Sequence, residues 1–485
     1  MLLTSTYSVK IKEANKAFED TATKYRELVS FFVSVAIEEH GLFERQELVS
    51  GKEHRALMEK LTLETKSRPV VPYPVNDRFY KFPSYLRRAA IAEALGMASS
   101  YFSNLKRWES SDASARGEKP SPPTVGYTYP AMYRDNCFVR TGTYTASLKV
   151  WTRNTWDWVD VRLRKSDVDY IRRHCGSCKE CVPTLRRRGK NWYLDFAFQT
   201  KKSLSTTPME DQIILAVDLG INSACTCSAM DASGTVLRRY FYRPRREEDL
   251  LAHRIGKVRR ANRGGMKPAY TKAEFEKIKK EKRRPLEPRN VGGGSRKTPR
   301  LWASVNNMNW HISEATAQAI IDFAADCHAD VIVFEHLDLQ GKKKGTKMRQ
   351  RLHLWRARDI QKIVEGKAHR LGLRVSRVCA WNTSKLAFDG SGEVERGVDG
   401  NYSICKFKTG KVYNCDLSAS YNIGARYFIR ETLRDMSETT RLAIEAKVPG
   451  CAKRSTATLS SLISLRAEIA SLASPSLNTR CILER

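Results

Sequence analysis

Two apolar runs, each followed by a carboxylate, constrain the fold of this chain more than any other feature of its sequence. The run IILAV is followed by Asp218, and the run VIVF is followed by Glu335. Short apolar runs bounded by turn signals are typical of strands that are buried on both faces of a sheet. We therefore expect both acids at the C-terminal ends of buried strands, where their side chains can enter a cleft.

A third acid, Asp416, stands at the start of the helical pattern DLSASYNIGAR. Three carboxylates that converge from distant elements can hold hard ions, and Mg²⁺ or Mn²⁺ suits them better than zinc. Phosphodiester hydrolysis uses such a site, with two Mg²⁺ ions that activate water and stabilise the leaving oxygen. Taken singly, Asp218 is also explained by a turn and Asp416 by a helix N-cap. Glu335 is harder to explain this way, because a carboxylate beside VIVF is costly unless it is partnered.

The charge of the chain points to a polyanionic partner. Eighty-five Lys and Arg residues against 53 Asp and Glu residues leave a net charge of +32. Such an excess indicates nucleic acid rather than a small acidic metabolite. No apolar run approaches the roughly 20 residues of a membrane-spanning helix, and the start MLLTSTYSVKIKEANK does not resemble a secretion signal. The scattered cysteines are typical of reduced thiols in a cytoplasm.

The N-terminal part of the chain alternates between strand-like and helical patterns. TYSVKIKEA predicts a strand, helical patterns follow it, and the polar stretch at 110–123 predicts a loop. From Thr124 to Phe198, β-branched and aromatic runs broken by turns predict a small β-barrel or sheet. The segment AAIAEALGMASSYFSNLKRW has two helical stretches that meet at Gly96, which indicates a helix–turn–helix or a helical hairpin.

The three acids and their neighbours resemble the motifs of a nuclease family. VDLGINSACTCS around Asp218, IVFEHL around Glu335 and DLSASYNIGAR around Asp416 are similar, in this order, to the three RuvC motifs of transposon-encoded TnpB nucleases and compact type V CRISPR effectors. The resemblance covers roughly residues 185–434, and Asn422 matches the Asn of the last motif. It implies that the three acids are the catalytic ligands, with Asp218 and Asp416 sharing two Mg²⁺ ions.

The resemblance also implies an α/β multidomain protein. We expect a wedge β-barrel at 1–12 and 124–205, a helical recognition insert at 13–123, an RNase H-like RuvC nuclease domain at 206–434, and a C-terminal tail of unknown role at 435–485. The implied function is RNA-guided cleavage of DNA beside a short motif. The implied partners are a guide RNA and double-stranded DNA, bound by a monomer or a homodimer near the nucleoid of a prokaryotic cytoplasm.

Three other functions are weighed on the sequence, and the family resemblance does not support one of them, a recombinase that joins DNA strands. A guided protein could bind DNA without cutting it, but an intact acid triad disfavours this function. An unguided RuvC-type junction nuclease is disfavoured by the large N-terminal half and by the surplus of basic charge.

One departure from the family lies at 379–415, where its members usually carry a zinc ribbon of two cysteine pairs. The first pair would fall near Ala387 and Gly390, and Lys408 stands where Cys405 would have its partner. Because four thiolates cannot be assembled here, we expect no zinc in this degenerate ribbon. We expect the loop to keep its shape by packing.

A second candidate metal site is the sequence HCGSCKEC, which begins at His174. Its spacing brings Cys175, Cys178 and Cys181 together in the sequence, and three thiolates with an imidazole match the composition of a zinc site. Because adjacent His174 and Cys175 seldom bind one ion together, a loop of thiols without metal is favoured over zinc.

Basic runs occur in the half of the chain that carries the acids. A charge run is usually a solvated helix face. Here the excess is one-sided, so contacts with RNA and DNA backbones are the better explanation. The first candidates lie in GKKKGTKMRQRLHLW: Lys342, Lys343, Lys344, Arg349 and Arg351. In a guided enzyme none of them has to read bases, because the guide does so by pairing.

Overall fold

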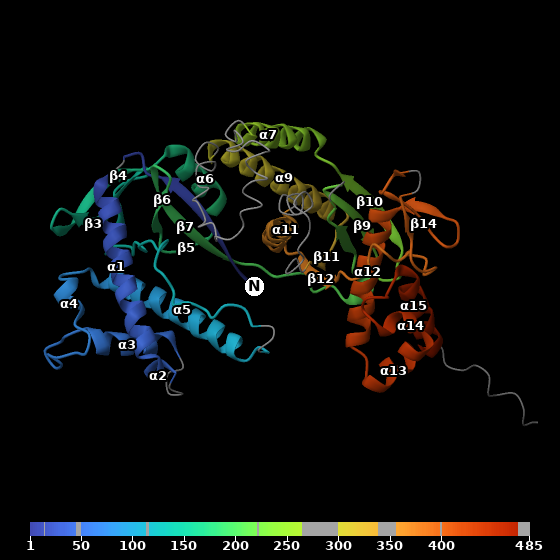
Figure 1. Ribbon diagram of the computed structural model, residues 1–485, viewed down its shortest axis with the longest axis horizontal. Helices are drawn as coiled ribbons and strands as arrows, with labels where there is room; N and C mark the ends of the chain where they lie inside the picture. Colours follow the sequence, from blue (N-terminus) through green and yellow to red (C-terminus); the bar gives the residue numbers. More distant parts are fainter. Residues whose placement is uncertain are drawn as a thin grey trace, which may run out of the picture. The chain divides into compact units, whose positions relative to one another are not determined.

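The computed structural model describes residues 1–13, 15–44, 50–112, 116–220, 223–263, 299–337, 356–397 and 400–473. The chain divides into two compact units: the N-terminal unit begins at Leu2 and ends at Lys201, and the C-terminal unit begins at Lys202. Each unit contains helices and strands, so the architecture is mixed α/β, as expected (Figure 1). Within the described ranges, no helix is both long and apolar enough to cross a membrane.

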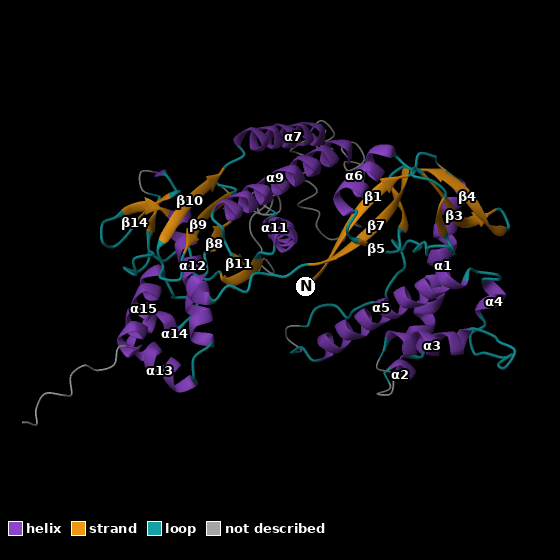
Figure 2. Ribbon diagram, turned by 180° about the vertical axis from the view of Figure 1, so that it is seen from behind, coloured by secondary structure: helices purple, strands orange, loops and turns teal. Residues whose placement is uncertain are grey.

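The strands of the N-terminal unit form two open sheets (Figure 2). In the first sheet, β7 (Asn191–Lys201) pairs antiparallel with β1 (Leu2–Lys10), β5 (Lys179–Glu180) and β6 (Thr184–Arg188). The second sheet has the order β2 (Phe138–Arg140), β3 (Thr145–Thr152), β4 (Thr155–Arg162). Isolated bridges join Ile11 to Leu163 and Ala131 to Thr184. Because single bridges replace continuous ladders, the described strands close no barrel, unlike the predicted β-barrel.

Five helices lie between β1 and β2 in the described part of the chain, and a sixth lies between β4 and β5. They are α1 (Lys16–Glu38), α2 (His40–Phe43), α3 (Gly51–Thr62), α4 (Val75–Arg78), α5 (Ser84–Glu109) and α6 (Lys165–Cys175). The side chain of Asn15 caps α1 by accepting a hydrogen bond from the Ala17 amide at 2.9 Å. Ser50 and Glu53 form a reciprocal capping box at the start of α3.

Helix α5 contradicts one sequence expectation. Gly96 lies inside this uninterrupted helix of 26 residues, so the predicted helix–turn–helix, and the helical hairpin offered as its alternative, are both wrong. Glycine in a helix interior costs only about 1 kcal/mol relative to alanine. That cost is smaller than the stabilisation that α5 gains by burying Leu86, Ile91 and the alanines between and beyond them.

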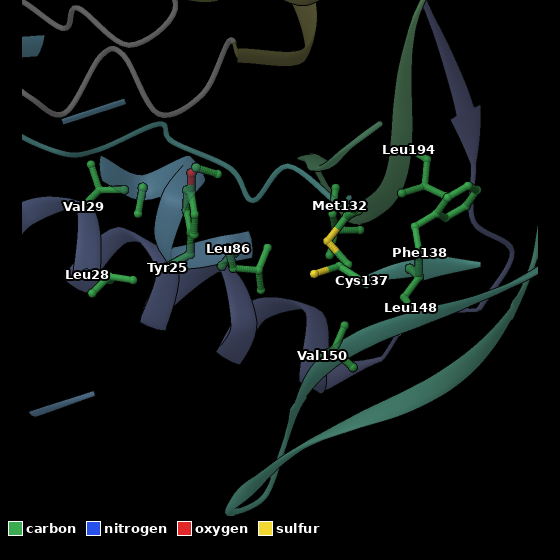
Figure 3. Close-up of a cluster of buried hydrophobic side chains, with 14 of the residues drawn as sticks. Tyr25, Leu28, Val29, Leu86, Met132, Cys137, Phe138, Leu148, Val150 and Leu194 are labelled. Carbon is green, nitrogen blue, oxygen red and sulfur yellow. The ribbon is translucent and has the colours of Figure 1, made fainter. Parts of the chain in front are cut away.

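The core of the N-terminal unit joins the helices to both sheets (Figure 3). Tyr25 and Leu28 of α1 and Leu86 of α5 are buried, and the same core contains Leu148 of β3 and Leu194 of β7. Full burial of one large apolar side chain contributes about 1.5–3 kcal/mol. The helices and sheets of this unit are therefore held together as one body.

The C-terminal unit is built on a five-stranded mixed sheet with the order β10-β9-β8-β11-β12. Its strands are β8 (Ile214–Asp218), β9 (Cys225–Met230), β10 (Val236–Tyr242), β11 (Val331–His336) and β12 (Arg374–Cys379). β8, β11 and β12 run parallel, whereas β9 and β10 follow β8 as antiparallel hairpins. This order places β8, which ends at Asp218, in the centre of the sheet.

The central strands are buried on both faces, as their apolar runs predicted. Ile214, Ala216, Val331 and Val333 belong to one core with residues of α12 (Cys415–Arg434) and α15 (Leu459–Ala473). The alternate residues Leu215, Val217, Ile332 and Phe334 belong to a second core. That core includes α9 (Pro299–Asp326) and α11 (Ala357–Leu371), which Figure 1 shows near the same sheet. A further helix, α7 (Arg245–Arg263), packs against α9.

Two smaller parts complete the C-terminal unit. The segment of the degenerate ribbon forms a small sheet from β13 (Glu395–Arg396), β14 (Ile404–Lys406) and β15 (Val412–Asn414). Ala387, Cys405, Phe407 and Cys415 form its own buried core. After α12, the segment that the sequence left as a tail of unknown role folds into α13 (Glu438–Lys447), α14 (Pro449–Ala452) and α15.

Candidate active site

The first two acids stand at neighbouring positions of two parallel strands. β8 and β11 pair so that Val217 lies opposite Phe334, and the next residues are Asp218 and Glu335. Both acids are half-buried and follow fully buried residues. The apolar runs predicted this placement at the ends of buried strands; the catalytic role of the acids stays a prediction.

The third acid approaches from helix α12. The side chain of Asn414 caps α12 by accepting a hydrogen bond from the Leu417 amide at 2.9 Å, so Asp416 is not the N-cap that was its simplest alternative explanation. A Cβ atom on Gly220 would lie 3.7 Å from Oδ2 of Asp416 and only 2.8 Å from the carbonyl oxygen of Ser223. The turn after β8 therefore passes close to Asp416, and a side chain at Gly220 would have to displace backbone.

The three acids influence one another electrostatically. Burial raises the pKa of Asp218 well above its usual range, and the negative charges of Glu335 and Asp416 raise it further. Burial also raises the pKa of Glu335 and of Asp416. Three acids that far apart in the sequence affect one carboxyl group only if the fold brings them close, so the predicted triad forms a cluster in space.

A chain of hydrogen bonds holds Glu335 in place. The hydroxyl of Thr383 donates to Oε1 of Glu335, which lowers the pKa of that carboxyl group against the effect of burial. Nε2 of Gln361 donates to the backbone oxygen of Glu335 at 2.9 Å. The backbone oxygen of Thr383 in turn accepts from Nδ2 of Asn422 at 3.0 Å. Asn422, which matched the last motif of the family, thus supports the loop that supports Glu335.

Arg426 ties the same loop to the C-terminal segment. Its guanidinium group is 4% exposed and donates to the backbone oxygens of four residues. Two of these, Cys379 and Trp381, accept at 2.7 and 2.8 Å and precede Thr383. The other two, Ser455 and Ala457, accept at 2.9 and 3.0 Å and precede α15. The tail, whose role the sequence left unknown, is therefore joined through Arg426 to the loop that carries Thr383.

The sequence analysis missed two arginines near the acids. Arg396 of the ribbon segment lowers the pKa of Asp218 and Asp416, and Arg243 lowers that of Asp416. Arg243 also donates to the hydroxyl of Ser223 at 2.9 Å. Its position directly after the aromatic strand YFY could have identified it. Nothing in the local sequence distinguishes Arg396 from the other basic residues.

The chemistry of the acid cluster fits a hard divalent cation. Its donors are carboxylate oxygens, the ligands that Mg²⁺ and Mn²⁺ prefer. Among the described residues, however, no group of three or more His, Cys, Asp or Glu side chains is placed so that it could hold a metal ion. The acids are close enough to repel one another but are not drawn together as one set of ligands.

The cysteines of the second candidate site do not gather. Cys175 is buried at the end of α6, and Cys178 follows in the next turn, where its amide donates to the oxygen of Cys175 at 2.9 Å. The amide of Cys181 instead donates to the oxygen of Ala197 in β7 at 2.7 Å. His174 stacks on Tyr170 with ring centroids 4.0 Å apart. Thiols without metal, favoured over zinc from the sequence, stay a prediction at this site.

The five candidate basic residues lie outside the described residues. They are Lys342, Lys343, Lys344, Arg349 and Arg351, and their contacts with nucleic acid stay a prediction.

Comparison with known proteins identifies relatives. The family Aq_aa04 matches residues 5–152, within the N-terminal unit. Protein aq_aa04 of Aquifex aeolicus (strain VF5) is 30% identical over 146 residues, which are 27% of this chain and 82% of the relative. The TnpB-like protein aq_aa05 of the same organism is 33% identical over 156 residues, 30% of this chain and 49% of the relative. This chain therefore spans about half the length of the second relative.

Solved structures give weaker similarity. The structure of a Cas12f1–sgRNA–target DNA complex covers 87% of this chain and 98% of that chain, at 13% identity and a TM-score of 0.31. A Cas12i–crRNA–dsDNA complex covers 94% of this chain and 67% of that chain, at 12% identity and a TM-score of 0.38. TM-scores this low do not establish a common fold. The relative aq_aa05 confirms the resemblance to TnpB-like proteins. The chain belongs to the Aq_aa04 family.

Proposed function

We propose that this protein is an RNA-guided DNA endonuclease whose nuclease site is the cluster of Asp218, Glu335 and Asp416. The observation that carries the proposal is the placement of these acids: Asp218 and Glu335 end the neighbouring parallel strands β8 and β11, and Asp416 of α12 lies beside the turn that follows β8. Bringing three carboxylates together in a half-buried site is unfavourable unless cations neutralise them. The hydrogen bonds of Thr383 and Asn422 maintain this arrangement.

Asp218, Glu335 and Asp416 would together hold the two Mg²⁺ ions. When bound, such ions activate water and stabilise the leaving oxygen of a phosphodiester. The chain's own part is to fix the carboxylates on rigid elements and to present positive charge. Arg396 and Arg243 supply that charge beside Asp416, where a phosphate group would be attracted.

We further propose that the C-terminal unit is a RuvC-type, RNase H-like nuclease domain and that the N-terminal unit supplies the wedge and helical recognition parts. The mixed sheet with acids at the ends of its central strands supports the first assignment. The guided part of the function rests on the TnpB-like motifs and on the net charge of +32. RNA and DNA backbones would offset that charge.

The test is to purify the full chain together with the RNA encoded beside its gene and to measure cleavage of a DNA that matches the guide. Asp218→Asn should reduce cleavage by at least about a thousandfold, because it removes a ligand charge on which both ions depend. Binding of RNA and DNA should be unchanged. Asp322→Asn is the matched control, since Asp322 is exposed on α9 and is not one of the three acids of the cluster.

Each result decides one part of the proposal. Cleavage by Asp218→Asn at the wild-type rate would remove the acid cluster from the chemistry. Cleavage of branched DNA by protein freed of RNA would keep the nuclease site and reject guidance. Tight guided binding without any cleavage by the wild type, in the presence of Mg²⁺, would leave only a DNA-binding function.

A further inference from the structure

The N-terminal unit contains a cavity of about 330 Å³ that the acid cluster does not share. Its floor comes from β1, from the end of β4, from α6 and from β7. The floor is apolar and buried, each side chain being at most 8% exposed: Val9, Leu163, Val168, Ile171, Phe196 and Phe198. Cavities of roughly 300–1,000 Å³ with apolar floors are typical of small-ligand sites. The space is therefore large enough for a planar aromatic group.

The rim of this cavity is polar and carries positive charge. Arg140 and Arg172 line it together with Glu180. The Glu180 carboxylate accepts hydrogen bonds from Arg140 at 2.9 Å and forms an ion pair with Arg134 at 2.6 Å. Arg140 also lies over the ring of Phe196, 5.0 Å from its centroid. These contacts fix Arg140 at the rim, whereas Arg172 is exposed on α6.

We propose that this cavity binds a single unstacked nucleotide, with its base on the apolar floor and its phosphate at the arginines of the rim. Bases are bound by stacking and contact with apolar and aromatic side chains, which tolerate any base because each has a flat π-face. Guanidinium groups bind phosphate oxygens with charge-assisted hydrogen bonds. An uncharged apolar ligand would use the floor but would make no use of the exposed guanidinium group of Arg172 at the rim.

RNA is the favoured source of the nucleotide, and this choice rests on the proposed function. The net charge of +32 favours binding of RNA by this chain. A bound RNA strand can turn one unpaired base out of its stack, and that base can enter the apolar cavity. A free nucleotide has the same chemistry. The experiment therefore has to separate a nucleotide inside a strand from a free one.

Cys178 is a built-in reporter of occupancy. It lines the cavity, whereas Cys181, three residues further on, does not, and both side chains are half-buried. Alkylation by iodoacetamide, followed at each cysteine by mass spectrometry, would be measured on the complex with RNA and on protein digested with ribonuclease. RNA should slow alkylation of Cys178 at least about tenfold, the size expected for loss of access to one stacked base site. The rate at Cys181 should change far less.

Two arginines on α6 provide the matched variants. Arg172 lines the cavity, whereas Arg173 does not, and its Nε donates to the oxygen of Asp169 at 3.3 Å. In the RNA complex, Arg172→Ala should abolish the protection of Cys178, and Arg173→Ala, which removes the same charge, should keep it. Cys178→Phe places a large side chain in the cavity and should weaken RNA binding about tenfold relative to Cys181→Phe.

The outcomes are distinct. Protection of Cys178 by RNA but not by added adenosine monophosphate supports a nucleotide inside a strand. Protection by the monophosphate alone supports nucleotide binding from solution. Equal alkylation of Cys178 in every state, or equal loss of protection in both arginine variants, would overturn the proposal. None of these measurements depends on DNA cleavage, so a failed nuclease assay and a failed cavity assay are told apart.

Discussion

The acid cluster and the cysteine sequence were both candidate metal sites, and they differ in how close their side chains lie in the folded protein. Asp218, Glu335 and Asp416 are far apart in the chain, yet they come close enough to raise the pKa of Asp218. Cys175, Cys178 and Cys181 are close in the chain, yet no group of three metal-binding side chains exists among them or elsewhere in the described residues. Position at the ends of buried strands brings acids from distant segments close to one another, but within the described residues neither region has three side chains placed to hold a metal ion.

The two regions differ in what holds their side chains. Around the acids, Thr383, Asn422 and Arg426 form a hydrogen-bonded scaffold that joins β11, the loop after β12 and the C-terminal segment. Around the cysteines, the backbone is committed to other partners: Cys178 to the end of α6 and Cys181 to β7. A side chain can contribute to a site only if the helix or strand that carries it directs that side chain toward the site.

Loss of Arg426 should have the largest effect. Arg426→Ala leaves four backbone oxygens near the acids without their donor, and each unsatisfied buried group costs about 1–3 kcal/mol. We expect the free energy of unfolding to fall by about 3 kcal/mol or more, measured by urea denaturation. Arg434→Ala, an exposed position on the same helix, should cause no measurable change. Equal stability of the two variants would mean that the scaffold does not exist in solution.

Loss of the Thr383 hydroxyl should weaken the acid cluster without unfolding it. Thr383→Val removes the donor to Glu335 and keeps the shape of the side chain. Removal of a group that orients a metal ligand typically costs about 10–100-fold in metal affinity or activity. We expect the Mg²⁺ concentration that gives half-maximal cleavage to rise about tenfold. Thr383→Ser, which keeps the hydroxyl, should have the Mg²⁺ dependence of the wild type. If Thr383→Val also has the wild-type Mg²⁺ dependence, Glu335 does not bind the metal.

The repulsion among the acids predicts a dependence of stability on pH. Because the pKa of Asp218 is higher in the folded protein than in the unfolded chain, the folded state holds this proton more tightly. In EDTA, the contribution of Asp218 to stability is therefore complete below the ordinary aspartate range and is lost as the pH rises through the raised pKa. Asp218→Asn should flatten this decline and increase the free energy of unfolding at pH 7. A wild-type slope in the variant would mean that the pKa of Asp218 is not raised in the folded protein.

Features that depend on local sequence could be predicted, whereas features that depend on contacts between distant segments could not. The runs before Asp218 and Glu335 are local signals, so the strands that carry these acids could be predicted. Arg396 could not, because it reaches the acids through the two-residue strand β13, which has no pattern of its own. The uninterrupted helix through Gly96 and the unclosed sheets were missed because tertiary packing and long-range pairing decide them. The resemblance added the grouping of the acids, which no local pattern contains.

The smallest effect is expected at the cysteines. Cys178→Ser with Cys181→Ser should leave the thermal midpoint of the protein unchanged, because neither thiol belongs to a group that could hold a metal in the described structure. Elemental analysis of protein expressed in medium with added zinc should find the same zinc content per chain in the wild type and in the double variant. If one zinc ion per chain is bound and is lost on mutation, these thiols gather when metal binds, as C-x-x-C spacings do in zinc ribbons. The backbone of Cys181 would then have to give up its bond to Ala197, and the cysteines, like the acids in the proposed function, would form a metal site only with the ion bound.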